Sequence, residues 1–436
     1  MVLSAMNTGV SGLQAEDQAL GVVGDNIANV DTVGFKSQRA VFEDVLGHSI
    51  LAGTSSGLPG SGVRVGSVQQ MFTQGSISNT GVSTDVALNG DGFFVVKGTV
   101  DGVSGNFYTR SGQMNINQDG NLVSTTGLQV QGYAANADGT LQAAITSLKV
   151  PTSALAPHAT STATVTANLD ASMTASDGSV IAAAWDAQNP SKTANYSTTM
   201  TVYDSVGNAH TMDVYFRKTA ANTYDFHALV NGNDVNPPAP GTNVEVGTGT
   251  LNFTTDGALN DVTTTTPISV SFNGATAAQT INLDFGKSIT AGGTGLDGTT
   301  QFASASSVSS QSQDGYASGD FSGVAIDGTG LVQGLYTNGQ KIAIGQLAVA
   351  KFRSNDGLGR AGQNVWIETR DSGTAAVGAA GTGGRAAVTA GALEASNVDL
   401  ATEFVGMIQH QRAFSANSKT ITTADEMLQE LINIKR

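Results

Sequence analysis

Apolar residues recur at every seventh position along the last part of the chain. A seven-residue repeat maintained over five steps predicts a helix that packs along its length against other helices. The residues at this position are Leu393, Leu400, Met407, Phe414, Ile421 and Leu428. A second position of the repeat is less apolar, since it holds Phe404, Gln411, Ser418, Asp425 and Ile432. We predict a helix over residues 391–436 whose partners lie partly outside its own chain; the alternative is an ordinary helix within one domain.

The start of this helix carries a capping signal. The segment Ser396-Asn397-Val398-Asp399 places a hydroxyl where it can accept a hydrogen bond from an unpaired backbone N–H of the helix. It also places an acid in the first turn. Lys435 and Arg436 place positive charge at the other end, where the helix dipole favours it. The regular helix is therefore expected to begin at Ser396.

The first thirty residues carry a matching repeat that glycines interrupt. The apolar residues at this spacing are Met6, Leu13, Leu20 and Ile27, with Leu3 and Val10 on the neighbouring face. Four glycines lie among them, namely Gly9, Gly12, Gly21 and Gly24. Each glycine costs a helix interior about 1 kcal/mol relative to alanine. We predict a helix over residues 1–30 that needs packing partners, followed by an extended connector over residues 31–70.

Short apolar runs separated by tight-turn signals fill residues 71–150. Two such runs, 85–88 and 93–96, flank Asn89-Gly90-Asp91-Gly92, and further Asp-Gly pairs follow at hairpin spacing. These turn residues adopt the left-handed conformation readily, so the pattern predicts an all-β domain. The same style returns over 315–390, and we interpret the two stretches as halves of one split β domain. The Gly- and Ala-rich segment 373–391 is expected to be a pliable joint.

The segment between these halves differs in composition. Seven of the eight prolines lie between Pro151 and Pro267, and residues 151–314 contain thirteen acidic against four basic residues. Such a segment predicts an inserted outer β domain that faces solvent. The expected fold is therefore mixed and mainly β, with nested β domains and long α-helical N- and C-terminal segments that pair in a coiled-coil-like core.

Composition excludes several classes of protein. The chain has no cysteine, so neither disulfides nor thiolate metal sites hold it together. A formal charge of −15 argues against nucleic acid as a partner, because no basic patch is available to neutralise phosphates. The first thirty residues lack the basic and continuous apolar regions of a cleaved signal peptide, and no apolar run is long enough to insert into a membrane. We expect either cytosolic residence or a dedicated export route.

Three sequence patterns resemble chemical sites but are better explained as ordinary features of turns and strands. Gly53-Thr54-Ser55-Ser56-Gly57 matches a nucleophile motif but lacks the strand and helix that the motif requires. Acids in the turns are isolated rather than set at alternate positions, which favours turns over calcium loops. His210 and His227 lie near Asp213 and Asp225, a spacing that strand alternation produces by chance. We expect no catalytic, cofactor or metal site.

The end motifs resemble those of one protein family. Ser11–Ala15 and Asp25–Asn29, the latter running into Thr32–Lys36, resemble the start of bacterial flagellar rod and hook proteins. Gly391–Leu400 resembles the opening of their C-terminal helix. The interior is similar to the hook members in particular, at three motifs: Asn89–Phe94, Thr201–His210 and Gly362–Trp366. The family motif residues are Asn29, Thr32, Gly34, Phe35, Lys36, Ser396, Asn397 and Asp399.

This resemblance implies a structural subunit that self-assembles into the flagellar hook, a flexible helical tube that transmits torque from rod to filament. It places the end helices innermost. The residues expected to carry self-assembly are Leu3, Val10, Leu13, Leu20, Ile27, Leu400, Phe404, Met407, Phe414, Ile421 and Leu428. The alternatives are a distal rod or hook–filament junction protein or, from a different class, a secreted β-rich adhesin or glycan-acting protein.

The resemblance also implies partners and a location. The expected partners are further copies of the chain, the distal rod protein, the hook–filament junction protein, the hook cap protein and the type III export apparatus. Neither nucleic acid binding nor membrane insertion is expected. The implied location is extracellular, in the hook of the flagellum, after export without a cleaved signal peptide.

Overall fold

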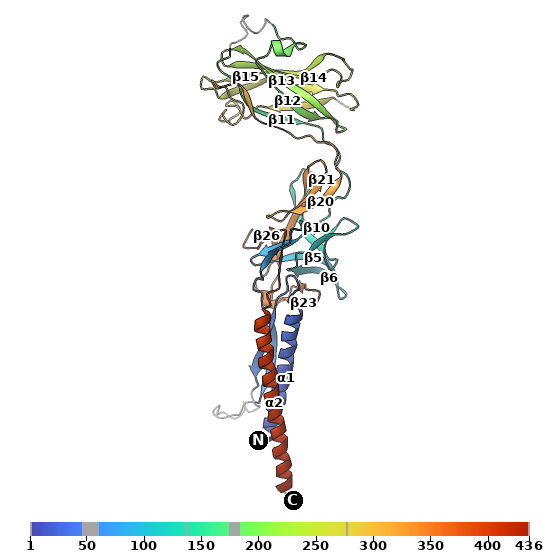
Figure 1. Cartoon of the computed structure of the whole chain (residues 1–436), viewed down its shortest axis with the longest axis vertical. Helices are drawn as coiled ribbons and strands as arrows, with labels where there is room; N and C mark the ends of the chain where they lie inside the picture. Colours follow the sequence, from blue (N-terminus) through green and yellow to red (C-terminus); the bar gives the residue numbers. More distant parts are fainter. Residues whose placement is uncertain (1, 46–60, 137, 174–183, 276–277, 435–436) are drawn as a thin grey trace. The chain divides into compact units, whose positions relative to one another are not determined.

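The chain divides into two compact units, which are described separately. The computed structural model describes residues 2–45, 61–136, 138–173, 184–275 and 278–434. Unit 1 contains residues 1–152, 322–335 and 341–436, and unit 2 contains residues 153–321 and 336–340. The fold is mainly β with one helix near each end of the chain, as the sequence predicted (Figure 1).

The largest sheet of unit 1 has twelve strands. Its main path runs β20-β21-β22-β9-β5-β6-β24-β23, and β10, β25, β7 and β8 pair beside this path. The bounds are β5 Phe93–Val100, β6 Val103–Thr109, β7 Met114–Ile116, β8 Leu122–Ser124, β9 Gln129–Ala135, β10 Leu141–Ser147, β20 Phe321–Ile326, β21 Leu331–Tyr336, β22 Lys341–Lys351, β23 Gly359–Arg360, β24 Trp366–Ile367 and β25 Ala376–Ala379. Strands from both sides of unit 2 in the sequence therefore share one sheet.

Two small sheets complete the β part of unit 1. Strand β26 (Ala387–Ala390) pairs antiparallel with β4 (Val86–Asn89), and β27 (Ala392–Glu394) pairs antiparallel with β3 (Ile77–Asn79). The segment expected to be a pliable joint, 373–391, instead contains the paired strands β25 and β26. That prediction was wrong because small residues can also allow strands to lie close together in a sheet, which composition alone does not reveal.

Aromatic side chains form the centre of unit 1. Phe93 and Trp366 lie with ring centroids 5.5 Å apart, and Tyr108 meets Phe352 edge to face at 4.7 Å. These rings come from β5, β6, β24 and the end of β22, so strands distant in sequence share one core. Burial also raises the pKa of Tyr108, with help from Glu368, to about 12.

Unit 2 contains two sheets that share a core. One sheet has the order β12-β13-β14-β15-β16, and the other has the order β17-β18-β11-β19. The bounds are β11 Thr162–Asn168, β12 Tyr196–Tyr203, β13 Ala209–Ala220, β14 Thr223–Asn231, β15 Asn243–Phe253, β16 Leu259–Thr266, β17 Ile268–Val270, β18 Gln279–Asp284 and β19 Ser307–Gln313. Val165 and Ile281 of one sheet belong to the same buried cluster as Val214, Phe226 and Leu251 of the other, so the sheets face each other.

The two helices of unit 1 pack side by side (Figure 1). They are α1 (Val2–Ala28) and α2 (Leu400–Ile434). Residues of the predicted connector 31–70 form a hairpin of β1 (Gln38–Asp44) and β2 (Val63–Gln70), which also contacts α1. The candidate nucleophile motif Gly53–Gly57 lies outside the described residues.

Helix α1 packs through small residues. Its buried positions are Gly9, Gly12, Ala15, Ala19, Val23 and Asn26, which recur every three or four residues and so form one face. A Cβ atom on Gly9 would lie 2.8 Å from the Ile421 side chain of α2, and one on Gly12 would lie 2.6 Å from the Asn417 amide. The two helices therefore approach closely along this face.

A buried ionic cluster joins the two ends of the chain. Glu394 at the end of β27 accepts from Lys36 Nζ at 2.6 Å and from Arg110 Nη1 at 3.2 Å. The amide of Gly75 donates to the same carboxylate at 2.9 Å. Burial lowers the pKa values of Lys36 and Arg110, and the Glu394 charge partly offsets this effect. This cluster fixes the chain that follows α1 to the chain that precedes α2.

We predict that Glu394→Gln destabilises unit 1 strongly. The two buried cations would lose the carboxylate that both of them contact directly, and such a loss costs about 3–5 kcal/mol. Urea unfolding followed by the fluorescence of Trp366, which is buried in unit 1, measures the effect once Trp185 of unit 2 is replaced by Phe. Glu43→Gln is the matched control, because Glu43 pairs with Arg64 at the surface. Equal effects of the two substitutions would contradict the prediction.

We also predict opposite effects of alanine at two glycines of α1. Gly24→Ala meets open space and should slow amide hydrogen exchange in α1, because alanine favours the helix by about 1 kcal/mol. Gly9→Ala gains the same helix propensity but collides with Ile421, so exchange should accelerate. Equal slowing by both substitutions would mean that α1 and α2 do not pack this closely.

Candidate functional site: the paired helices and their anchor

Asn397 ties together three segments of unit 1. Its side-chain oxygen accepts from the Ser37 amide at 2.7 Å. Its side-chain nitrogen donates to the Met71 carbonyl at 2.7 Å and to Thr73 Oγ1 at 2.8 Å. An extended residue just before α2 therefore holds the chain that enters β1 and the chain that leaves β2.

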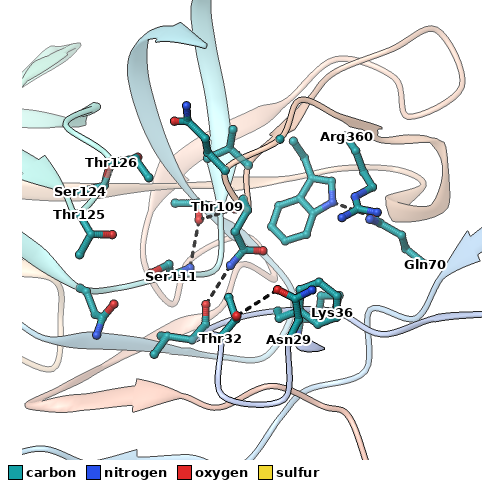
Figure 2. A pocket seen from close by; sticks show the side chains of 18 of the residues that line it. Asn29, Thr32, Lys36, Gln70, Thr109, Ser111, Ser124, Thr125, Thr126 and Arg360 are labelled. Carbon is teal, nitrogen blue, oxygen red and sulfur yellow. Dashed lines mark hydrogen bonds between the residues drawn. The ribbon is translucent and has the colours of Figure 1, made fainter. Parts of the chain in front are cut away.

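The N-terminal motif residues shape the turn after α1. Asn29 donates to the Asp25 carbonyl at 2.8 Å. It also accepts from Thr32 Oγ1 at 3.1 Å (Figure 2). Gly34 has a φ of 69°, and a Cβ atom there would lie 2.6 Å from the Arg110 carbonyl carbon. Glycine is therefore required at this position for two reasons, the backbone conformation and the close approach. Phe35 is buried beside it.

Helix α2 begins later than its sequence signal predicted. Asp399 accepts from the amides of Ala401 at 2.8 Å and Thr402 at 3.2 Å, so it caps a helix that starts at Leu400. Ser396 accepts from the Val398 amide within the extended segment instead. The predicted helix 391–436 therefore started too early, both at 391 and at Ser396. Residues 392–394 form β27, and Asn397 is held by Ser37, just before β1, and by Met71, just after β2, which keeps this segment extended.

Polar contacts between α1 and α2 that the structure describes include two side-chain pairs. Glu16 Oε2 lies 2.6 Å from His410 Nδ1. Asn26 donates to Glu403 at 3.0 Å and exchanges two hydrogen bonds with the Gln38 backbone. Burial raises the pKa of Glu403, and the Asn26 amide partly counters this effect. These residues were not predicted from the sequence, although the spacing of Ala15, Ala19, Val23 and Asn26 was a signal for the inner face of α1.

The apolar residues expected to carry self-assembly differ in their exposure, and Ile421 among them packs against Gly9 of α1. Val10, Leu400, Phe404 and Phe414 are exposed, Phe404 at 50%. The half-buried members are Leu13, Leu20, Ile27, Met407, Ile421 and Leu428. The side chain of Leu3 lies outside the described residues. Further large exposed residues of α2 are Val405, Ile408, Met427 and Ile432. The helix pair therefore presents apolar surface to its surroundings.

A polar hollow of about 490 Å³ lies beside the turn after α1 (Figure 2). One wall is the hairpin of β23 and β24, whose turn residues Gln363 and Asn364 have φ values of 50° and 57°. These values fit a type I′ turn. Asn364 donates to the Val33 carbonyl at 2.9 Å, and Trp366 donates to Gln70 at 2.6 Å. The interior motif Gly362–Trp366 thus meets the N-terminal motif at this hollow.

The histidines that invited a metal site have other partners. His210 lies 3.2 Å from Asp204 and stacks on Phe272, while His227 lies 2.6 Å from Glu245 and stacks on Trp185. Among the described residues, no group of three or more His, Cys, Asp or Glu side chains is arranged to hold a metal ion. In the same part of the chain, neither helix has the length and apolar character needed to span a membrane.

Four family models match the chain. "Flagella basal body rod protein" matches residues 6–36, and "Flagellar hook protein FlgE/F/G D1 domain" matches residues 87–182. "Flagellar basal body protein FlaE D2 domain" matches residues 168–316, and "Flagellar basal body rod FlgEFG protein C-terminal" matches residues 389–434. The two rod models cover the helices, the turn after α1 and the segment before α2. The other two models cover β segments.

Two relatives that align with this chain over nearly its full length are flagellar hook proteins. The flagellar hook protein FlgE of Salmonella typhimurium is 38% identical over 432 residues, which is 98% of each chain. FlgE of Borreliella burgdorferi is 33% identical over 459 residues, which is 100% of each chain. The crystal structure of Helicobacter pylori flagellar hook protein FlgE2 covers 71% of this chain and 98% of its own, with 15% identity and a TM-score of 0.50, and so supports the fold. The chain belongs to the flagellar hook protein family, whose members are structural proteins rather than enzymes.

Proposed function

We propose that this hook subunit polymerises through the exposed apolar residues of its paired helices, called here the helix strip: Val10, Leu400, Phe404, Val405, Ile408 and Phe414. The observation that carries the proposal is the exposure of these side chains. Leu400, Phe404 and Ile408 recur every four residues and so lie on one face of α2, and exposed large apolar side chains that gather on one face mark an interaction surface. We assign the half-buried Leu13, Leu20, Ile27, Met407 and Leu428 to the edge of the same contact, whereas Ile421 faces Gly9 of α1 within the subunit.

The strip on one copy meets a different surface on the next copy, so successive copies need not close into a ring. A heterologous contact that does not close generates a helical polymer. In this arrangement α1 and α2 form the inner, coiled-coil-like core of a tube. Their mutual contacts, Glu16 with His410 and Asn26 with Glu403, keep each pair together as one building block.

The outer β domains complete a flexible coupling between rod and filament. In a tube that bends while rotating, outer surfaces slide while the helical core stays packed. Only 13% of residues are charged, so few ion pairs would need to break and reform during such sliding. The neighbours of the tube would be the distal rod protein, the hook–filament junction protein and the hook cap protein. The subunit would reach this extracellular site through the type III export apparatus, without a cleaved signal peptide.

Phe404→Asp and Phe414→Asp should each abolish tubes without unfolding the subunit. Both side chains are exposed in the monomer, so the carboxylate stays hydrated there. In a packed interface the unpaired charge costs several kcal/mol at every subunit. Electron microscopy of hook–basal bodies from a hookless strain that expresses each variant measures assembly, and circular dichroism of the monomer measures folding.

Thr420→Asp is the control, because it places the same carboxylate at an exposed polar position of α2 that is not three, four or seven positions from any residue of the helix strip. Tubes should form with this variant. If Phe404→Asp also assembled normally, the helix strip would not be the assembly surface.

Replacing residues 156–318 with a short Gly/Ser linker should leave polymerisation intact. The Leu155 amide donates to the Gly319 carbonyl at 2.8 Å, and the Gly319 amide donates back at 3.2 Å, so a short linker can join the two ends. This closeness supports a nested insertion whose removal leaves the host domain able to close. We expect tubes with altered curvature in electron micrographs. Folded subunits that never polymerise would show that the deleted part is needed for assembly.

A further inference from the structure

The polar hollow of unit 1 has no assigned role. Its lining comes from the end of α1 and the turn after it, the segment 109–113, the turn 124–126 and the β23–β24 hairpin (Figure 2). The N-terminal motif and the interior motif Gly362–Trp366 thus converge on a space of about 490 Å³. That space is large enough for several side chains of another molecule.

The charges around the hollow are already matched. Three charged residues line it, namely Asp25, Lys36 and Arg360. Arg360 lies 3.6 Å from Asp25, and Lys36 is fully buried against Glu394. Trp366 is 3% exposed and therefore presents little aromatic surface on which a sugar or a base could stack. An occupant is therefore expected to be uncharged and polar.

Several hydrogen-bonding groups in the lining are unused. Among the residues that the structure describes, the side chains of Gln113, Thr125 and Gln363 make no hydrogen bond to the protein. Gln363 also holds a left-handed backbone with a φ of 50°, which is unfavourable for glutamine compared with asparagine or glycine. Amides and hydroxyls of this kind match the backbone and small polar side chains of a peptide.

We propose that the polar hollow is a socket for an uncharged segment, rich in Ser, Thr, Gly or Asn, from a second copy of this chain. The proposal rests on the proposed polymer, in which each subunit is bordered by further copies near its helices. Asp25 near the end of α1 and Asn29 just after it line the hollow, so the hollow lies beside one of the two helices through which we propose that subunits meet. The chain itself supplies suitable segments, because it contains 54 glycines and few charged residues.

Thiol labelling tests whether the socket is filled on assembly. The chain has no cysteine, so Thr125→Cys introduces a single thiol at an exposed position of the lining. We expect maleimide to label it readily in the monomer and poorly in purified hooks. Equal labelling in both states would overturn the proposal.

Filling the hollow provides a second, steric test. Thr125→Trp should prevent tubes, while Thr146→Trp, an exposed threonine of β10 outside the lining, should permit them. Circular dichroism checks that both monomers fold. Normal tubes from Thr125→Trp, or loss of tubes in both variants, would overturn the socket. If the wild-type chain formed no tubes in the same strain, the proposed polymer itself would fail, which separates the two conclusions.

Discussion

The carboxylate of Glu394 between Lys36 and Arg110 is the interaction on which unit 1 depends. These three side chains are almost completely withdrawn from water, and they come from the turn after α1, the end of β6 and the strand before α2. Buried charges tolerate little displacement, because separation leaves each of them without solvent or partner. The cluster therefore sets where each helix leaves the β part, and Asn397 fixes the last few residues before α2.

The composition of α1 explains why the helices are suited to assembly. Its small residues are used on the inner face, where Gly9 and Gly12 admit Ile421 and Asn417 of α2. Most of the large apolar residues that could have formed an intramolecular core remain half-buried or exposed. A helix pair built in this way is held together by close backbone approach and still offers apolar surface to other molecules. The glycines of α1 allow the two helices to pack without large side chains, and this leaves the large apolar residues of the helix strip exposed.

Local patterns predicted the elements better than the contacts between them. The two end helices, the hairpins at Asp-Gly pairs and the mainly β interior followed from periodicity and turn residues. The hairpin of β1 and β2 was predicted to be a connector, because its strands carry no strong alternation and lie far apart in the sequence. The delayed start of α2 depended on Asn397 bonding to residues more than three hundred positions away. Arg110 and Glu394 carried no local signal, since their meaning arises only when distant strands bring them together.

The paired chain ends of unit 2 have a mechanical consequence. Leu155 pairs with Gly319, and His158 pairs with Tyr316, so the chain enters and leaves this unit through adjacent antiparallel segments. A force that pulls these two ends apart acts across the bridges and breaks them one at a time, and each backbone hydrogen bond contributes only about 1 kcal/mol. Backbone hydrogen bonds that break one after another in this way separate at a low pulling force. A subunit that carries load in a rotating machine would therefore need to transmit that load along its helices and the sheet of unit 1, and to leave the two ends of unit 2 unstretched.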